Sequence, residues 1–249
     1  MLLQKSCHDL DILQWLIGKR PKSVHSFGSL SHFVRKNAPE GSPERCIDGC
    51  PAADTCPYNA IKLYLDDKQN DWFRTACTRE TAPTDESVER ALRTTQYGKC
   101  VYKCDNDVVD HQNVSILYED GSTAVFNMSA FTKGGRRIRI MGTRAELRGA
   151  LDGEDAPLEL YRFDTGTTEY IPVSGEDGIA GGHGGGDEGI LRCLYDYLAE
   201  GVKSPSLSDI GASVASHMTV FAAEESRLTG QAVDCAEYEA RIRAAAEEA

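Results

Sequence analysis

The sequence predicts an α+β fold, in which an open, mostly antiparallel β-sheet is backed by helices. From Val114 to Val173 apolar and polar side chains alternate with a period of two, and turn signals such as Asp120-Gly121 separate the alternating runs. Amphipathic segments lie on both sides of this region, and consecutive hairpins of this kind need helices to cover one face. We therefore expect residues 1–249 to form a single domain with a cysteine-rich insertion at about 35–105.

The composition is that of an ordinary globular protein, because 41% of the 249 residues are hydrophobic and 27% are charged. Lys and Arg number 27 against 39 Asp and Glu, and the net charge of −12 argues against a surface that tracks nucleic-acid phosphates or an anionic membrane. No apolar run approaches the roughly 18–20 residues of a membrane span, and the first residues lack the pattern of a signal peptide. We expect a cytoplasmic protein that binds neither nucleic acid nor membranes.

The N-terminal segment predicts a helix over His8 to Ile17, because apolar side chains recur there at three- and four-residue spacing and Gly18 supplies a stop. His8 and Asp11 share one face of this helix, opposite the apolar stripe. The pair can therefore act as acid and base in catalysis. The alternative is structural: Asp9 and Asp11 complement the positive end of the helix dipole, and His8 belongs to the capping region.

The next stretch predicts a strand, a long loop and a short helix. Lys22 to Phe33 alternates imperfectly and predicts the strand, and the loop after it is rich in Pro, Gly and polar residues. Thr84 to Thr94 predicts the helix, with Thr84 as N-cap. Asp105 to His111 gathers carboxylates and an imidazole, which suit a cation, but Asp and Asn are typical of turns and we interpret the segment as a solvated turn.

The nine cysteines are too few for a disulfide scaffold, and in a reducing cytosol they stay thiols or bind metal. Five lie in two groups, with the patterns Cys-x3-Cys-x5-Cys and Cys-x3-Cys, and the three-residue gap is one that zinc ligands use. Four of the five, brought together, would form a tetrahedral site for structural zinc. Buried free thiols are the alternative. Two of the five precede Pro, as in iron–sulfur proteins, although the spacing differs from that of ferredoxins. The five are Cys46, Cys50, Cys56, Cys100 and Cys104.

A glycine-rich loop, Ile179 to Glu188, precedes a predicted helix over Ile190 to Leu198. The G-x-G-x-x-G sequence that ends at Gly189 matches a dinucleotide fingerprint in form, but no hydrophobic strand precedes it and no second parallel strand follows the helix. We expect the glycines to let His183 approach a small ligand and Asp187 to cap the helix. A plain flexible loop with a capping Asp is the alternative.

Two more helices are predicted near the C-terminus. Ser206 to Leu228 predicts a long helix, and Tyr238 to Ala249 an exposed one rich in Ala, Glu and Arg. The face of the long helix that we expect to be apolar holds Ile210, Val214, His217, Phe221 and Leu228.

Residues 5–18, which read KSCHDLDILQWLIG, resemble the helix that carries the catalytic histidine in the glucose–fructose oxidoreductase, inositol dehydrogenase and rhizopine-catabolism (Gfo/Idh/MocA) family. Val109-Asp110, ahead of a strand that ends in Glu119-Asp120-Gly121, resembles the first sheet hairpin of that family. The run from His183 to Asp187 resembles its loop facing the sugar site. The stretches CIDGCPAADTCPY and YGKCVYKCDNDVVDHQ are similar to a cysteine-bearing branch of the family.

The resemblance implies a two-domain NAD(P)-dependent oxidoreductase of sugars, cyclitols or related polyols. The family's dinucleotide-binding half, with its Glu-Lys-Pro motif, has no match here, so the chain resembles the substrate-binding and oligomerisation half. By resemblance, His8 is the general acid/base that exchanges a proton with the substrate hydroxyl, and His183 and Asp187 line the pocket. NAD or NADP would be bound mainly by the absent domain, the chain would be inactive alone, and copies would assemble into a homo-oligomer through the sheet.

The sequence departs from the family next to the histidine. Many members carry Asp four residues before it and Gly two residues before it, where this chain has Gln4 and Ser6. Lys5 is then a candidate to hold a substrate oxygen, and the alternative is that it points to solvent. Two other functions stay open: a binding or oligomerisation module without catalysis, stapled by a metal–thiolate site, and an NAD-dependent glycosidase.

Overall fold

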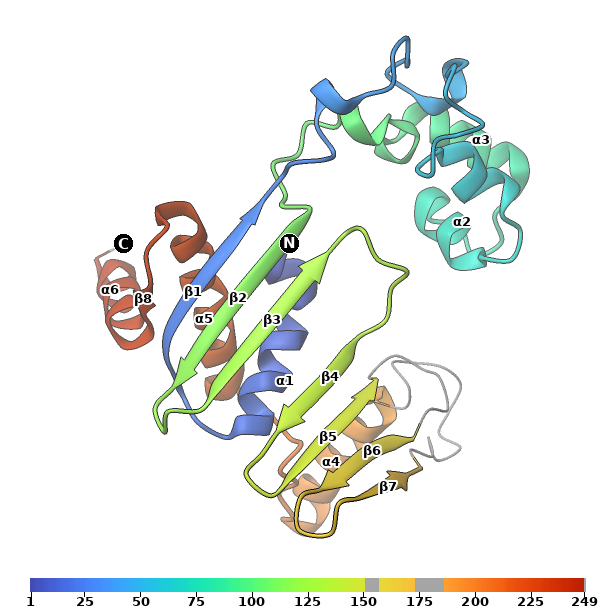
Figure 1. The fold of residues 1–249 in the computed structure, drawn as a ribbon. Helices are drawn as coiled ribbons and strands as arrows, with labels where there is room; N and C mark the ends of the chain where they lie inside the picture. The colour runs from blue at the N-terminus through green and yellow to red at the C-terminus, as the bar shows by residue number, and fades with distance from the viewer. Residues whose placement is uncertain (151–156, 173–185, 249) are drawn as a thin grey trace. The chain divides into compact units, whose positions relative to one another are not determined.

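A computed structural model describes residues 1–150, 157–172 and 186–248 (Figure 1). The chain divides into two compact units, one formed by residues 1–130 with 216–249 and the other by residues 131–215. The predicted consecutive hairpins are confirmed, but the described strands belong to two four-stranded antiparallel sheets rather than to one.

The first unit is built on a sheet with the strand order β3-β2-β1-β8. Val24 lies opposite Ile116 across the β1–β2 pair, and Val114 lies opposite Phe126 across the β2–β3 pair. These residues face the same side because strand positions two apart share a face. The strands are β1 (Pro21–Ser29), β2 (His111–Tyr118), β3 (Thr123–Ser129) and β8 (Val233–Asp234).

Helices cover one face of this sheet, and Figure 1 shows α1 and α5 against it. The core between helices and sheet includes Leu10, Val24, Tyr118 and Val220, which are at most 3% exposed. The predicted helix from His8 to Ile17 is confirmed, and Gly18 ends it in a left-handed conformation. The helices are α1 (Cys7–Ile17), which continues a π-helical turn (Leu2–Ser6), α5 (Ile210–Thr229) and α6 (Cys235–Glu247).

The prediction of which face of α5 is buried is wrong. Phe221 and Leu228 are 42% and 69% exposed, whereas small residues such as Ala222, Ala223 and Ser226 are fully buried. Small side chains let the helix backbone approach the sheet closely, so a face can be buried without being strongly hydrophobic.

The C-terminal helix was predicted to be exposed, but its first turns are fixed to the rest of the first unit. It begins at Cys235, where the Asp234 side chain accepts the backbone N–H groups of the first turn. Tyr238 is 9% exposed, and Glu239 pairs with Arg20 at 2.8 Å.

The segment between β1 and β2 forms the insertion, which consists of short helices around a small core of its own. Thr84 is the N-cap of α3 as predicted, and it forms a capping box with Ser87. The Thr84 side chain accepts the backbone N–H of Ser87, and the Ser87 side chain accepts the backbone N–H of Thr84. The core residues are Ala60, Cys77, Val88, Ala91 and Leu92. The helical segments are Arg35–Asn37, Cys46–Asp48, Ile61–Asp66, α2 (Asp71–Thr78), α3 (Asp85–Thr94), Gln96–Gly98 and Val101–Lys103.

The second unit holds a sheet with the strand order β4-β5-β6-β7, together with α4 (Gly186–Glu200). A tight turn at Asp164 to Gly166 joins β6 to β7 in an antiparallel hairpin. Within the described part of the chain, no helix is long and apolar enough to cross a membrane. The strands are β4 (Arg137–Met141), β5 (Ala145–Ala150), β6 (Leu158–Arg162) and β7 (Thr167–Ile171).

Candidate functional site

Lys5, His8 and Asp11 all lie on the N-terminal helical segment of the first unit. The opposite side of this segment is fixed in the core, where Leu2 and Leu10 are 3% and 2% exposed. Lys5 and His8 are exposed and Asp11 is half-buried. Lys5 and His8, and part of Asp11, are therefore accessible to a ligand from outside.

A change in helix geometry occurs directly before His8. Leu2–Ser6 is π-helical, and regular α-helix begins at Cys7. Such wide turns are rare and occur frequently at functional sites. The sulfur of the buried Cys7 lies 4.0 Å from Nδ1 of the exposed His8 imidazole.

The other two predicted pocket residues belong to the region around α4. Asp187 is in the first turn of α4, an exposed position where a carboxylate complements the helix dipole. His183 lies outside the described residues, and its convergence with His8 on one pocket stays a prediction.

Four of the five clustered cysteines line one small cavity in the insertion, which is partly open to solvent. They are Cys46, Cys50, Cys56 and Cys100. Cys104 is not among the lining residues, and its thiol donates instead to the carbonyl of Cys100 at 3.6 Å. All five are free thiols.

Backbone pairing brings Cys100 beside Cys46, which is 54 positions earlier in the chain. The Cys100 N–H donates to the carbonyl of Glu44 at 2.9 Å, and Arg45 pairs with Lys99 in an isolated antiparallel bridge. The Arg45 guanidinium also donates to a carbonyl at the end of α3, at 2.8 Å. These contacts tie the loop that carries the first three cysteines to the segment that carries the fourth.

The thiols are not gathered around one ion position. Among the residues that the structure describes, no group of three or more His, Cys, Asp or Glu side chains is arranged to hold a metal ion. Burial is the main cause that raises the pKa of the Cys46 thiol, the other lining thiols raise it further, and a backbone hydrogen bond at Ala60 opposes the shift. The arrangement therefore does not support the predicted single zinc ion.

Aromatic rings pack beside the cysteine cavity. Tyr58 and Tyr102 line it, and His32 bonds to the Tyr102 hydroxyl through Nε2 at 3.2 Å. Phe33 packs edge-on against Tyr58 with ring centroids 4.9 Å apart. The rings give this end of the insertion a rigid wall.

Asp110 fixes the base of that wall, and its place corrects the prediction of a solvated turn. Its side chain is 1% exposed and accepts the backbone N–H groups of Ser31, His32 and Phe33 at 2.9, 2.7 and 3.3 Å. It also bonds to His111 at 2.7 Å. Burial by itself would raise the pKa of this carboxyl, but the donors outweigh burial and lower the pKa to about 2.

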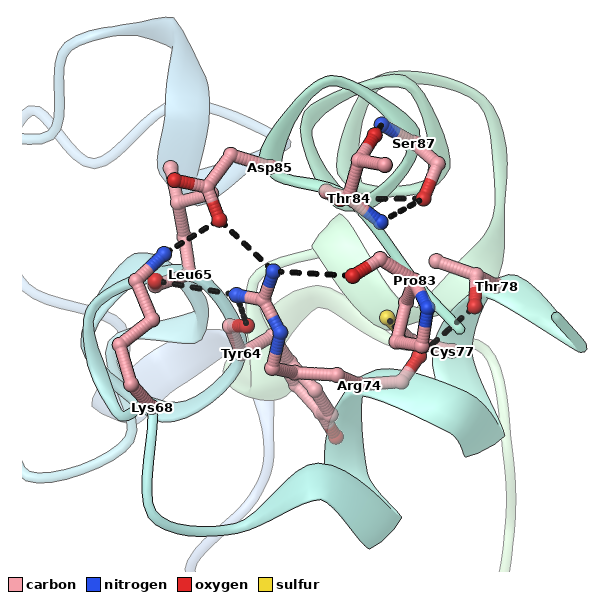
Figure 2. Close-up of polar contacts among 10 residues, drawn as sticks. All are labelled: Tyr64, Leu65, Lys68, Arg74, Cys77, Thr78, Pro83, Thr84, Asp85 and Ser87. Carbon is pink, nitrogen blue, oxygen red and sulfur yellow. Dashed lines mark hydrogen bonds and ion pairs between the residues drawn. The ribbon is translucent and has the colours of Figure 1, made fainter. Parts of the chain in front are cut away.

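The helical part of the insertion is held by one buried cation, shown in Figure 2. The Arg74 guanidinium, whose side chain is 6% exposed, donates to the carbonyls of Tyr64, Leu65 and Pro83 and to the Asp85 carboxylate. The bond to Asp85 is 2.7 Å long. Arg74 thus joins the segments before α2 and before α3 to α2 itself, as a structural residue that the sequence did not single out.

Comparison with known proteins decides the family. Residues 1–170 match the model described as "Oxidoreductase family, C-terminal alpha/beta domain" of the Gfo/Idh/MocA proteins. This chain belongs to that family. Among curated proteins, this chain is similar to the Bacillus subtilis (strain 168) protein YteT, whose name classes it as an oxidoreductase, at 22% identity over 208 residues, or 78% of this chain and 46% of YteT.

Solved structures confirm the fold of the Gfo/Idh/MocA C-terminal domain. An oxidoreductase from Agrobacterium radiobacter, solved with NAD⁺, L-tartaric acid and magnesium, matches with a TM-score of 0.53 and 15% identity over 95% of this chain and 49% of that one. An oxidoreductase domain protein from Kribbella flavida matches with a TM-score of 0.53 and 15% identity over 94% of this chain and 51% of that one. The chain thus spans about half the length of the relatives it matches.

Proposed function

We propose that this chain is the substrate-binding half of an NAD(P)-dependent oxidoreductase that acts on a sugar, cyclitol or related polyol. One observation carries the proposal: in a member of this family, Lys5, His8 and Asp11 stand on the outer side of a helix whose inner side is fixed in the core. We propose that His8 is the general acid/base, that Lys5 binds a substrate oxygen, and that Asp11 orients the His8 ring. His183 and Asp187 complete the substrate pocket in this proposal.

The described residues do not form a dinucleotide site of their own. Every strand pair among them is antiparallel, and Gly186 and Gly189 lie inside α4 rather than in a turn between a strand and a helix. In a Rossmann domain the dinucleotide phosphates lie at that turn, at the edge of a parallel sheet. We therefore assign the binding of NAD or NADP to a domain outside this chain and expect the chain to be inactive alone.

The chemistry divides between the two halves. A nicotinamide ring, when bound, supplies the hydride acceptor or donor. The His8 imidazole takes the proton from the substrate hydroxyl as the carbon is oxidised, and returns it in the reverse direction. Lys5, three residues away on the same side of the helix, places an ammonium where it can bind a neighbouring hydroxyl oxygen. The rigid attachment of the helix to the core keeps this geometry fixed during proton transfer.

A homo-oligomer through the first sheet belongs to the same proposal. Helices cover one face of this sheet, and on the other face Phe27, Leu117 and Val125 are 62%, 37% and 65% exposed. These positions alternate with the buried ones, so they lie together on the uncovered face. We also propose a cytoplasmic location, where reducing conditions keep the nine free cysteines reduced.

The test is a turnover assay of the complete gene product. It would be incubated with NAD⁺ or NADP⁺ and a panel of sugars, cyclitols, polyols and their glycosides, and both reduction of the nicotinamide and release of free sugar would be followed. We expect stoichiometric reduction with at least one member of the panel, and none when the 249-residue chain is used alone. Glycoside cleavage without net nicotinamide reduction would favour an NAD-dependent glycosidase, and failure to bind any member of the panel would favour a non-catalytic module.

A further inference from the structure

We propose that Cys46, Cys50, Cys56 and Cys100 bind an iron–sulfur cluster in the cavity that they line. The proposal concerns the insertion and does not depend on the oxidoreductase activity. The cluster is held by four cysteine thiolates, and each thiol gives its proton to solvent when its sulfur binds iron.

Thiols from two separate parts of the chain converge on one cavity: three come from the loop between residues 46 and 56, and the fourth is that of Cys100. The lining contains no Asp, Glu or His beside them, so sulfur is the main ligand that the cavity offers. Thiolate-only sites of this kind suit soft centres such as iron–sulfur clusters or zinc.

Hydrophobic burial holds this part of the insertion only weakly. Between residues 31 and 58, a stretch that the structure describes throughout, Ser42 is the sole fully buried residue, and apolar contacts come from partly buried side chains such as Phe33 and Ile47. Partial burial of a few side chains in a loop of this length contributes little free energy against its conformational entropy. A centre with four thiolate bonds supplies that free energy directly, as in small metal-stabilised domains.

The spacing of the thiols favours a cluster over a single ion. Four thiolates around one zinc must all lie at about 2.3 Å from it, so they crowd around a point. The described side chains contain no such group, although the four cysteines surround a common space. A cluster fills the space between its cysteines with its own irons and sulfides, which fits sulfur atoms that share a cavity without meeting at a point.

Local backbone features support the choice of four ligands from five cysteines. Gly49, between the first two, has φ of +85°, a conformation that lets the chain turn back so that Cys46 and Cys50 line the same space. Asn59 donates to the carbonyl of Ala53 at 2.9 Å and so closes the loop around Cys56. Cys104 lies outside the lining and is the matched control.

The experiment measures metal on the whole chain. The protein would be produced without a polyhistidine tag, purified under anaerobic conditions, and reconstituted with ferrous iron and sulfide. Iron, acid-labile sulfide and zinc would then be measured per chain. We expect iron and sulfide in equal amounts with a broad visible absorption, loss of most of both in Cys46→Ser and Cys100→Ser, and wild-type amounts in Cys104→Ser.

Two results would overturn the proposal. One is iron and sulfide at trace level before and after reconstitution, and the other is zinc as the bound metal with no sulfide. If the Cys46→Ser chain does not fold, X-ray absorption at the iron edge of the wild-type protein decides. An all-sulfur first shell with a short iron–iron distance supports the cluster, and a shell of oxygen and nitrogen contradicts it.

Discussion

The Asp110 carboxylate accepts the backbone N–H of His32 at 2.7 Å, across 78 positions of sequence. With Ser31 and Phe33 as further donors, this one side chain satisfies three consecutive backbone groups after β1 and holds them to the start of β2. Both ends of the insertion are thus fixed to the sheet at a single buried carboxylate, which is 1% exposed.

The first prediction is that Asp110→Asn destabilises the first unit by about 2 kcal/mol at pH 7. The folded-state pKa is about 2 and the ordinary value is 3.8, so the ionised carboxyl stabilises the fold above pH 4. That contribution is lost as the pH falls through the folded pKa. Urea unfolding of both proteins at pH 7 and pH 3 measures it. The difference between them should shrink at pH 3, and an equal difference at both pH values would refute the role of the charge.

The second prediction concerns the buried guanidinium of Figure 2. Arg74→Lys keeps the charge but cannot reach three carbonyls and a carboxylate together, so unpaired carbonyls stay buried. We expect a loss of about 1–3 kcal/mol in the local stability of α2 and α3, measured by hydrogen exchange of their amides.

Arg90→Lys is the control for Arg74, because its pairing with Glu80 at 3.2 Å is exposed on both sides. Exposed ion pairs contribute at most about 1 kcal/mol to stability. The amides of α2 and α3 in this variant should therefore exchange hydrogen at nearly the wild-type rates. Equal effects of the two substitutions would show that burial of Arg74 has no structural importance.

The third prediction concerns the contact between α5 and β1. The Ser226 hydroxyl accepts the N–H of Ser26 at 3.0 Å and donates to the carbonyl of Gln231 at 2.6 Å. Ser226→Ala leaves the buried N–H of Ser26 without this partner, at a cost of about 1–3 kcal/mol, whereas the carbonyl of the exposed Gln231 can bond to water. Hydrogen exchange at the Ser26 amide should accelerate accordingly. Thr229 is exposed on the same helix, so Thr229→Ala should leave the exchange rate of the Ser26 amide unchanged. Equal exchange rates of this amide in the two variants would count against the contact.

Much of the fold follows from local sequence signals. The alternation around Asp120-Gly121 and the periodicity before Gly18 correspond to a hairpin and a helix that the structure confirms. The strand β5 was missed because Ala145–Ala150 reads AELRGA, with few β-branched or aromatic residues. The buried face of α5 was missed because Ala and Ser pack there, and the close approach of two backbones leaves no hydrophobic stripe to detect.

The candidate site could be predicted only in part, for a physical reason. The spacing on one helix places Lys5, His8 and Asp11 on one side without knowledge of the fold. The choice of four cysteines from five depends on the Arg45–Lys99 bridge, which joins segments more than fifty positions apart. Asp110 looks like a turn residue in sequence because its donors are some eighty positions away. Contacts of that range leave no local pattern.

The central claim is that His8 moves the substrate proton. In the complete gene product, His8→Ala should lower kcat by about 10²–10⁴ while the Kd for the nicotinamide nucleotide stays unchanged, because general acid–base catalysis contributes that much and His8 does not bind the nucleotide.

Lys19→Ala is the control for this measurement, since Lys19 is exposed just beyond the other end of the same helix. It should leave both quantities at the wild-type level. The account therefore predicts a large fall in kcat for His8→Ala alone, and turnover by that variant at the wild-type rate would contradict it.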